Sequence, residues 1–182
     1  MTPLQLIQEL CTARLLLRGW RAEDRGPFAA MNADPVVREH FPSLLSRNES
    51  DRYADRIEAE FFERRFGLWA VEIPGVAPFA GFTGLSVPGF EASFTPCVEV
   101  GWRLAREHWG RGYAIEAARA AIEFGFTQAG LNEIVSFTVP ANTRSVRVMQ
   151  KLGMKFSGEF DHPGIAEGHP LRRHVLYRLV RA

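Results

Sequence analysis

The stretch Glu99-Val100-Gly101-Trp102-Arg103-Leu104, followed after four residues by Trp109-Gly110-Arg111-Gly112-Tyr113-Ala114, decides the fold. Residues 97–104 alternate apolar and polar side chains, as a half-buried strand does. Beyond the two glycines, residues 114, 118, 121, 122 and 125 are small or apolar and share one helical face. The sequence therefore predicts a strand, a glycine turn and a helix that packs closely on a sheet.

A glycine turn at the start of a helix is suited to holding phosphate. The first N–H groups of a helix lack partners, the helix dipole favours an anion, and glycine lets phosphate oxygens approach the backbone. The alternative is a tight turn that serves helix packing alone. A dinucleotide-binding fold is disfavoured because Glu116-Ala117 stands near the expected third glycine. No Gly-Lys-Ser/Thr occurs, so a P-loop is absent.

Outward from this stretch, the chain alternates between strand and helix patterns. On the N-terminal side the periodicity predicts a strand at 13–18, a helix within 21–35, an amphipathic helix at 49–66 and a hairpin of 68–73 with 79–87. On the C-terminal side it predicts a strand at 134–139, a helix at 142–152 capped by Asn142, and a hairpin of 155–160 with 171–180.

Length and composition indicate a single globular domain over residues 1–182. Hydrophobic residues make up 46% and charged residues 24%, which argues against disorder. The 22 Lys and Arg nearly balance 21 Asp and Glu, so no net field draws the chain to nucleic acid or an anionic membrane. No window approaches the roughly 20 apolar residues of a membrane helix. We expect a cytoplasmic protein that binds neither nucleic acid nor a membrane.

The cysteines and histidines suggest no metal site. Cys11 and Cys97 are the two cysteines, and neither has the spacing of a zinc site or a redox pair, so we expect small buried thiols. None of the five histidines has a partner at metal-ligand spacing. His162 and His169 lie in a loop that we expect to border an acceptor site.

Four separated blocks resemble the GNAT superfamily of N-acetyltransferases, and within it the RimJ/RimL-type branch, over residues 12–180. They are residues 12–18 with Glu23-Asp24, then 99–104, 109–117 and 142–154. Trp109 replaces the Gln or Arg usual in the broader superfamily, and Met154 replaces a Phe. The resemblance implies an α/β fold with a mixed, mostly antiparallel sheet of about seven strands and helices on both faces.

The resemblance also implies acetyl-CoA as co-substrate. N–H groups of about Gly110 to Ala114 would bind the pyrophosphate, and Trp102, Arg103 and Leu104 would line the pantetheine arm through their backbone. Further coenzyme contacts are expected from Trp109, Arg111, Tyr113 and Asn142, where solvated surface charge is the alternative for Arg111.

Acetyl transfer needs a neutral amine, while amines with a pKa from about 8 to 10 are mostly protonated at neutral pH. Glu99 is the candidate base, with a solvent-facing strand residue as the alternative. Ser145 is the candidate acid for the departing thiolate, although a first-turn helix residue needs no such role. The N–H of Val100 or Trp102 is expected to stabilise the oxyanion.

The sequence does not identify the amine acceptor. The resemblance allows a protein N-terminus or a small-molecule amine, with specificity set by loops at about 35–50, 88–96 and 161–170. A non-catalytic acyl-CoA-binding sensor or interaction module is the alternative function, and a homodimer is the candidate assembly.

Overall fold

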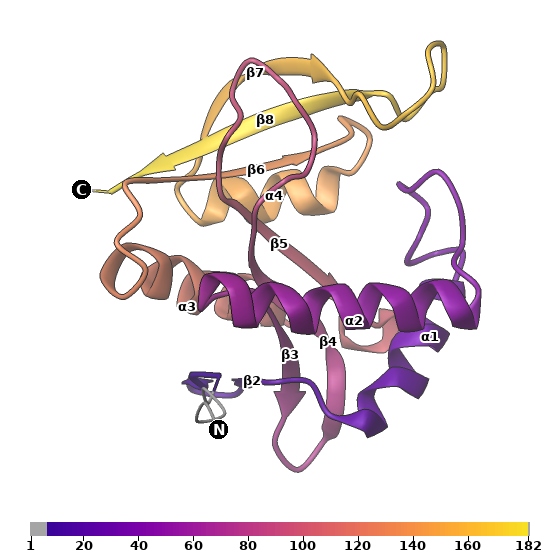
Figure 1. The fold of residues 1–182 in the computed structure, drawn as a ribbon, viewed down its shortest axis with the longest axis vertical. Helices are drawn as coiled ribbons and strands as arrows, with labels where there is room; N and C mark the ends of the chain where they lie inside the picture. Colours follow the sequence, from indigo (N-terminus) through magenta and orange to yellow (C-terminus); the bar gives the residue numbers. More distant parts are fainter. Residues whose placement is uncertain (1–6, 182) are drawn as a thin grey trace.

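A single twisted sheet of eight strands organises residues 7–181, the part of the chain that the computed structural model describes (Figure 1). The strand order is β1-β2-β3-β4-β5-β6-β8-β7, and every neighbouring pair is antiparallel except β5 and β6. The strands are β1 (Leu10–Cys11), β2 (Leu16–Arg18), β3 (Leu68–Ile73), β4 (Ala77–Ser86), β5 (Glu99–Leu104), β6 (Glu133–Thr138), β7 (Lys155–Asp161) and β8 (Arg173–Val180). The mixed, mostly antiparallel sheet is confirmed, and the two-residue β1 adds an eighth strand.

Helices cover both faces of the sheet. They are α1 (Arg25–Ala33), α2 (Arg47–Arg64), α3 (Tyr113–Thr127) and α4 (Thr143–Lys151), with short 3-10 turns η1 (Ala22–Asp24) and η2 (Arg106–His108). Phe82 of β4 contacts Phe28 of α1 and Tyr53 of α2. Leu85, on the opposite face of the same strand, lies against Gly125 of α3. The α1/α2 face and the α3/α4 face are therefore distinct, and the site can draw on both.

Local sequence explains where the helices near the site begin. The Ser46 hydroxyl accepts a hydrogen bond from the Glu49 N–H, and the Glu49 carboxylate accepts from the Ser46 N–H at 2.8 Å. This capping box starts α2 two residues before the expected position. Asn142 caps α4 as predicted, because its Oδ1 accepts from the Ser145 N–H at 3.2 Å.

The expectation of two buried cysteines is wrong. Cys11 is exposed, because β1 lies at the edge of the sheet, and Cys97 is half-buried just before β5. Among residues 7–181, no helix combines the length and apolar character needed to cross a bilayer.

A buried ion pair joins β2 to the start of the first helical segment. The Arg18 guanidinium, 1% exposed, donates to both carboxylate oxygens of Asp24 at 2.7 and 2.9 Å and to Glu72 of β3 at 2.7 Å. Asp24 also accepts from the Arg21 N–H. Replacing Asp24 would leave the buried Arg18 charge with Glu72, which is 21% exposed, as its remaining carboxylate partner and would weaken two charge-assisted hydrogen bonds in a medium of low polarity.

We expect Asp24→Asn to lower the free energy of unfolding by about 3–5 kcal/mol. The matched control is Asp55→Asn, which removes a carboxylate from an ion pair with Arg25 whose Asp side chain is 63% exposed, and should cost less than about 1 kcal/mol. Urea unfolding of both variants measures the difference. Equal losses would show that the Arg18 pair stabilises no more than a surface pair.

Candidate coenzyme and acceptor site

The glycine turn between β5 and α3 has the backbone geometry of an anion cradle. Gly110 and Gly112 have φ values of 74° and 81°, in the left-handed region that side chains disfavour. Space around Gly110 is open, since a Cβ there would meet no atom within 4 Å. In residues 7–181, the N–H groups of residues 110–115 have no acceptor. The turn therefore fits the phosphate-binding role predicted for it.

The start of α4 lies beside this turn. The Trp109 indole N–H donates to the carbonyl oxygen of Leu104 at 2.8 Å, which fixes the ring against the end of β5. The Arg144 guanidinium lies over the Trp109 ring, 4.5 Å from its centroid, and pairs with Glu39 at 3.2 Å. The sequence-predicted blocks at 99–104, 109–117 and 142–154 are thus adjacent in space.

The parallel strands β5 and β6 separate after Glu99, on the way to the glycine turn. Within the described residues, β5 and β6 pair at one position, Glu99 with Val135. In an antiparallel ladder, alternate N–H groups point to the same neighbour. Ala105 donates its N–H to β4, so the Arg103 N–H also faces β4, whereas the Trp102 N–H faces the opening. We therefore expect backbone contacts to the coenzyme from Trp102 and not from Arg103.

Glu99 begins β5 on the α1/α2 face, at the point of separation. Burial raises the pKa of its carboxyl group to about 8, and no neighbouring charge or hydrogen bond offsets this effect. The residue nevertheless keeps partial exposure. A partly exposed carboxyl group whose pKa is raised towards neutral pH is suited to proton transfer.

Ser145 and Asn142 form the first turn of α4. Besides capping the helix, Asn142 donates its amide N–H to the Thr138 hydroxyl of β6 at 3.0 Å. Both of its polar atoms therefore have structural partners. Ser145 is half-buried, and its hydroxyl makes no hydrogen bond to residues 7–181, which leaves it available to a ligand.

The side chains of Arg103 and Tyr53 lie near Glu99, although the sequence predicted only a backbone contact to the coenzyme for Arg103 and no site role for Tyr53. Glu99, Gly101 and Arg103 share the α1/α2 face of β5, and a Cβ at Gly101 would meet nothing within 4 Å. The Tyr53 ring of α2 packs on the same face, and burial raises its pKa. Alternation placed these strand residues on one face, but no local signal indicates that α2 supplies Tyr53 to them.

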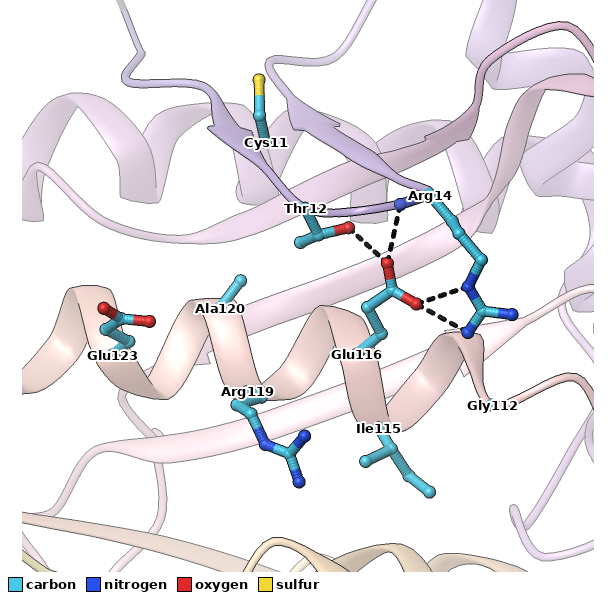
Figure 2. Close-up of a pocket in the computed structure, with 9 residues that line it drawn as sticks. All are labelled: Cys11, Thr12, Arg14, Gly112, Ile115, Glu116, Arg119, Ala120 and Glu123. Atoms are coloured by element: carbon cyan, nitrogen blue, oxygen red, sulfur yellow. Dashed lines mark hydrogen bonds and ion pairs between the residues drawn. The ribbon is translucent and has the colours of Figure 1, made fainter.

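A surface hollow of about 460 Å³ runs along α3 and adjoins the turn at Gly112 (Figure 2). Glu116 projects from α3 towards the β1–β2 connection, where its carboxylate accepts from the Thr12 hydroxyl at 2.6 Å and pairs with Arg14 at 2.6 Å. Arg14 in turn donates to the carbonyl oxygen of Arg111 at 3.0 Å. This contact holds the glycine turn against the β1–β2 connection. Glu99 does not line the hollow.

The connection between β4 and β5 crosses over β6 and β8 (Figure 1). An aromatic cluster holds it there. It comprises Phe90, Phe94, Phe137, Phe160, His162 and His174. Phe137 lies two residues beyond Val135 in β6 and hence on the face that carries Glu99. Burial lowers the pKa of His162 and His174, which favours neutral rings. The predicted loops at 88–96 and 161–170 therefore meet at this cluster.

No group of three or more His, Cys, Asp or Glu side chains capable of holding a metal occurs in residues 7–181. The Nδ1 atoms of His162 and His169 instead accept backbone N–H groups of Gly164 and Leu171, both at 3.1 Å, in their own loop.

Comparison with known proteins agrees with this geometry. The acetyltransferase (GNAT) domain model matches residues 14–155. The uncharacterized protein YkkB of Bacillus subtilis is 30% identical over 152 residues, 82% of this chain and 86% of its own length. A GNAT-family acetyltransferase structure from Bacillus anthracis has a TM-score of 0.78 at 23% identity, covering 95% of this chain and 98% of that one.

Mycobacterium smegmatis RimJ, solved with CoA-disulfide, has a TM-score of 0.74 at 18% identity and covers 96% of this chain and 88% of its own. At such identities the two structures establish the fold alone, so the RimJ/RimL-type branch stays a prediction. The family model, in contrast, spans most of the sequence. The chain therefore belongs to the GNAT acetyltransferase family.

Proposed function

We propose that the protein transfers the acetyl group of acetyl-CoA to a primary amine that attacks the thioester directly, with Glu99 as the base. The observation that carries this proposal is the carboxyl group of Glu99, whose pKa burial raises to about 8. It lies where β5 and β6 separate, on the strand that leads into the phosphate-suited glycine turn. Family membership supports acetyl transfer itself.

Acetyl-CoA would lie along the opening between β5 and α4. The free N–H groups of residues 110–115 would hold its pyrophosphate, and the Trp102 N–H would hydrogen-bond the pantetheine arm or the oxyanion. Trp102 fits the oxyanion role better than Val100, because Val100 directly follows the residue that bridges β5 to β6.

The reaction needs two proton movements. Glu99, ionised, takes a proton from the acceptor ammonium, and the amine lone pair then forms the C–N bond at the thioester carbonyl. The C–S bond breaks as the tetrahedral intermediate collapses. The Ser145 hydroxyl donates its proton to the departing thiolate and recovers a proton from the positively charged nitrogen of the intermediate. The products are an N-acetyl amide and CoA thiol.

We expect Ser145→Ala to lower kcat by about tenfold while acetyl-CoA affinity stays unchanged, because a thiolate with a parent pKa near 8.5 needs modest assistance. Thr143→Ala is the matched control: it removes an exposed hydroxyl from the same turn of α4. Single-turnover thiol release measures both. If the two variants behave alike, Ser145 is a helix residue without a catalytic role.

Calorimetric titration with acetyl-CoA, followed by thiol release across a panel of amines and N-terminal peptides, tests the proposed function. Coenzyme binding together with amine-dependent thiol release supports an enzyme. Binding without turnover for every acceptor supports the alternative of a non-catalytic sensor, and failure to bind acetyl-CoA removes both.

A further inference from the structure

Arg103 is a half-buried residue whose guanidinium Nε is fully buried, and it has no carboxylate partner among residues 7–181. Its Nη1 donates to Oδ1 of Asn32 at 2.8 Å, and Asn32 is fully buried. Its Nε is buried and has no hydrogen-bond partner among residues 7–181. Its Nη2 makes no hydrogen bond with those residues either. An uncompensated guanidinium in such surroundings is costly, so a ligand that supplies the missing acceptor would be bound favourably.

A second cation lies beside it. The guanidiniums of Arg38 and Arg103 both lie over the Phe41 ring, 4.5 and 4.2 Å from its centroid. Arg38 is 8% exposed and donates from Nε and Nη2 to the carbonyl oxygen of Ser43. Burial and the charge of Arg103 lower the pKa of Arg38 to about 10, so it stays protonated at neutral pH. The pair creates a local positive field in a chain of nearly zero net charge.

The position of Arg103 relative to Glu99 defines what could bind there. Both side chains rise from the α1/α2 face of β5, and between them Gly101 leaves open space. Residues four apart on a strand have Cα atoms about 13 Å apart, and two long side chains can bring their charged groups closer together than that. A molecule of several heavy atoms would therefore span from the Glu99 carboxylate to the Arg103 guanidinium.

We propose that the acceptor is a small amine that also carries a carboxylate or phosphate group, which Arg103, supported by Arg38, binds. This inference rests on the proposed function. The amine lies at Glu99 and the anion at Arg103, whose Nε and Nη2 form a fork suited to two anionic oxygens. Because Nε is buried, a neighbouring side chain has to shift for an anion to reach it, and Phe41, at 38% exposure, is the most exposed of the three aromatic rings around the guanidinium. Polyamines are disfavoured, because their second cation would face two arginines.

The test compares amines that differ in the anionic group. β-Alanine and δ-aminovalerate are each paired with their amides, O-phosphoethanolamine is paired with ethanolamine, and spermidine is the polycation. We expect kcat/KM, from CoA thiol release, to be about 10- to 100-fold higher for the anionic member of at least one pair. The carboxylate and phosphate pairs show which anion is preferred. A preference for the neutral members or for spermidine overturns the proposal.

Two variants assign the preference to a residue. Arg103→Met, which keeps an unbranched apolar chain, should bring the ratio of anionic to neutral acceptor close to one. Arg56→Met is the matched control, because Arg56 is an exposed cation that lies over Tyr53 at 5.3 Å. It should keep the wild-type ratio. If both variants change the ratio equally, the preference is a general field effect and the assignment to Arg103 is wrong.

Calorimetry keeps this test separate from the proposed function. Titrating the CoA-loaded protein with each pair measures acceptor binding without chemistry. If acetyl-CoA binds but no amine is turned over, the catalytic proposal fails, while tighter binding of the anionic member still supports the anion site. Equal binding of both members, or binding of neither, overturns the anion site.

Discussion

Replacing Glu99 with Gln is expected to lower kcat/KM for acetyl transfer by about 10²- to 10⁴-fold, because the amide cannot accept the ammonium proton. Affinity for acetyl-CoA should be unchanged, since Glu99 lies away from the glycine turn. With a pKa raised to about 8, the wild-type carboxyl is mostly protonated at pH 7, so its rate should rise with pH through about 8. This inflection should be missing in Glu99→Gln.

The control for this prediction is Glu133→Gln, which changes the first residue of β6 as Glu99→Gln changes the first residue of β5. Pre-steady-state thiol release and calorimetry separate chemistry from binding. A Glu99→Gln variant with a normal rate at pH 8 would show that the amine loses its proton to water or to another group.

Stability gives a second readout for Glu99. The folded-state pKa of about 8 lies above the unfolded value near 4.5. The raised pKa therefore stabilises the folded state by its full amount below pH 4.5, and this stabilisation is lost as pH rises through 8. Between pH 5 and 9 the wild type should lose more unfolding free energy than Glu99→Gln, which has no charge to bury.

The second large effect concerns the glycine turn. Gly110→Val should weaken acetyl-CoA binding by about 100-fold or more, because the side chain enters the space where phosphate oxygens approach free N–H groups, and such charge-assisted bonds are worth about 1.5–3 kcal/mol each. We expect the same direction for Gly112→Val. Calorimetric titration measures the loss.

Gly75→Val is a closely matched control. Gly75, in the turn between β3 and β4, has the same φ of 74° as Gly110, and a Cβ there also meets nothing within 4 Å. Backbone strain of about 1–3 kcal/mol should then be common to both variants. If both bind acetyl-CoA equally well, the turn at residues 109–112 is a packing device and the coenzyme lies elsewhere.

Local chemistry made much of the fold predictable. Asn142 identified the start of α4 because its side chain accepts a hydrogen bond from the N–H three residues ahead and so caps the helix. The glycines at 110 and 112 indicated a turn before α3. The start of α2 was placed two residues late because the Ser46 cap was not recognised. Short-range signals of this kind depend on few residues and survive tertiary packing.

The acceptor side was less accessible from sequence. Arg38 and Tyr53 come from a loop and a helix that the chain brings to β5 through tertiary packing, and neither has a spacing that predicts this meeting. Arg103 was expected to act through its backbone. The register with β4 turns its N–H towards β4, so our proposal assigns the role to its side chain instead. The proposed coenzyme-binding residues are close together in the sequence, whereas the proposed acceptor-binding residues come from separate segments that only the folded chain brings together.

The single bridge between β5 and β6 has a consequence for cooperativity. Strands β1–β5 form one continuous ladder and β6–β8 form another. Because β5 and β6 separate after Glu99, few backbone hydrogen bonds join the two ladders. The two ladders remain connected through α3, which packs on β4, β5 and β6. We therefore expect each ladder to open as a cooperative unit, so that amide protons near Val135 exchange through a local opening of lower free energy than global unfolding.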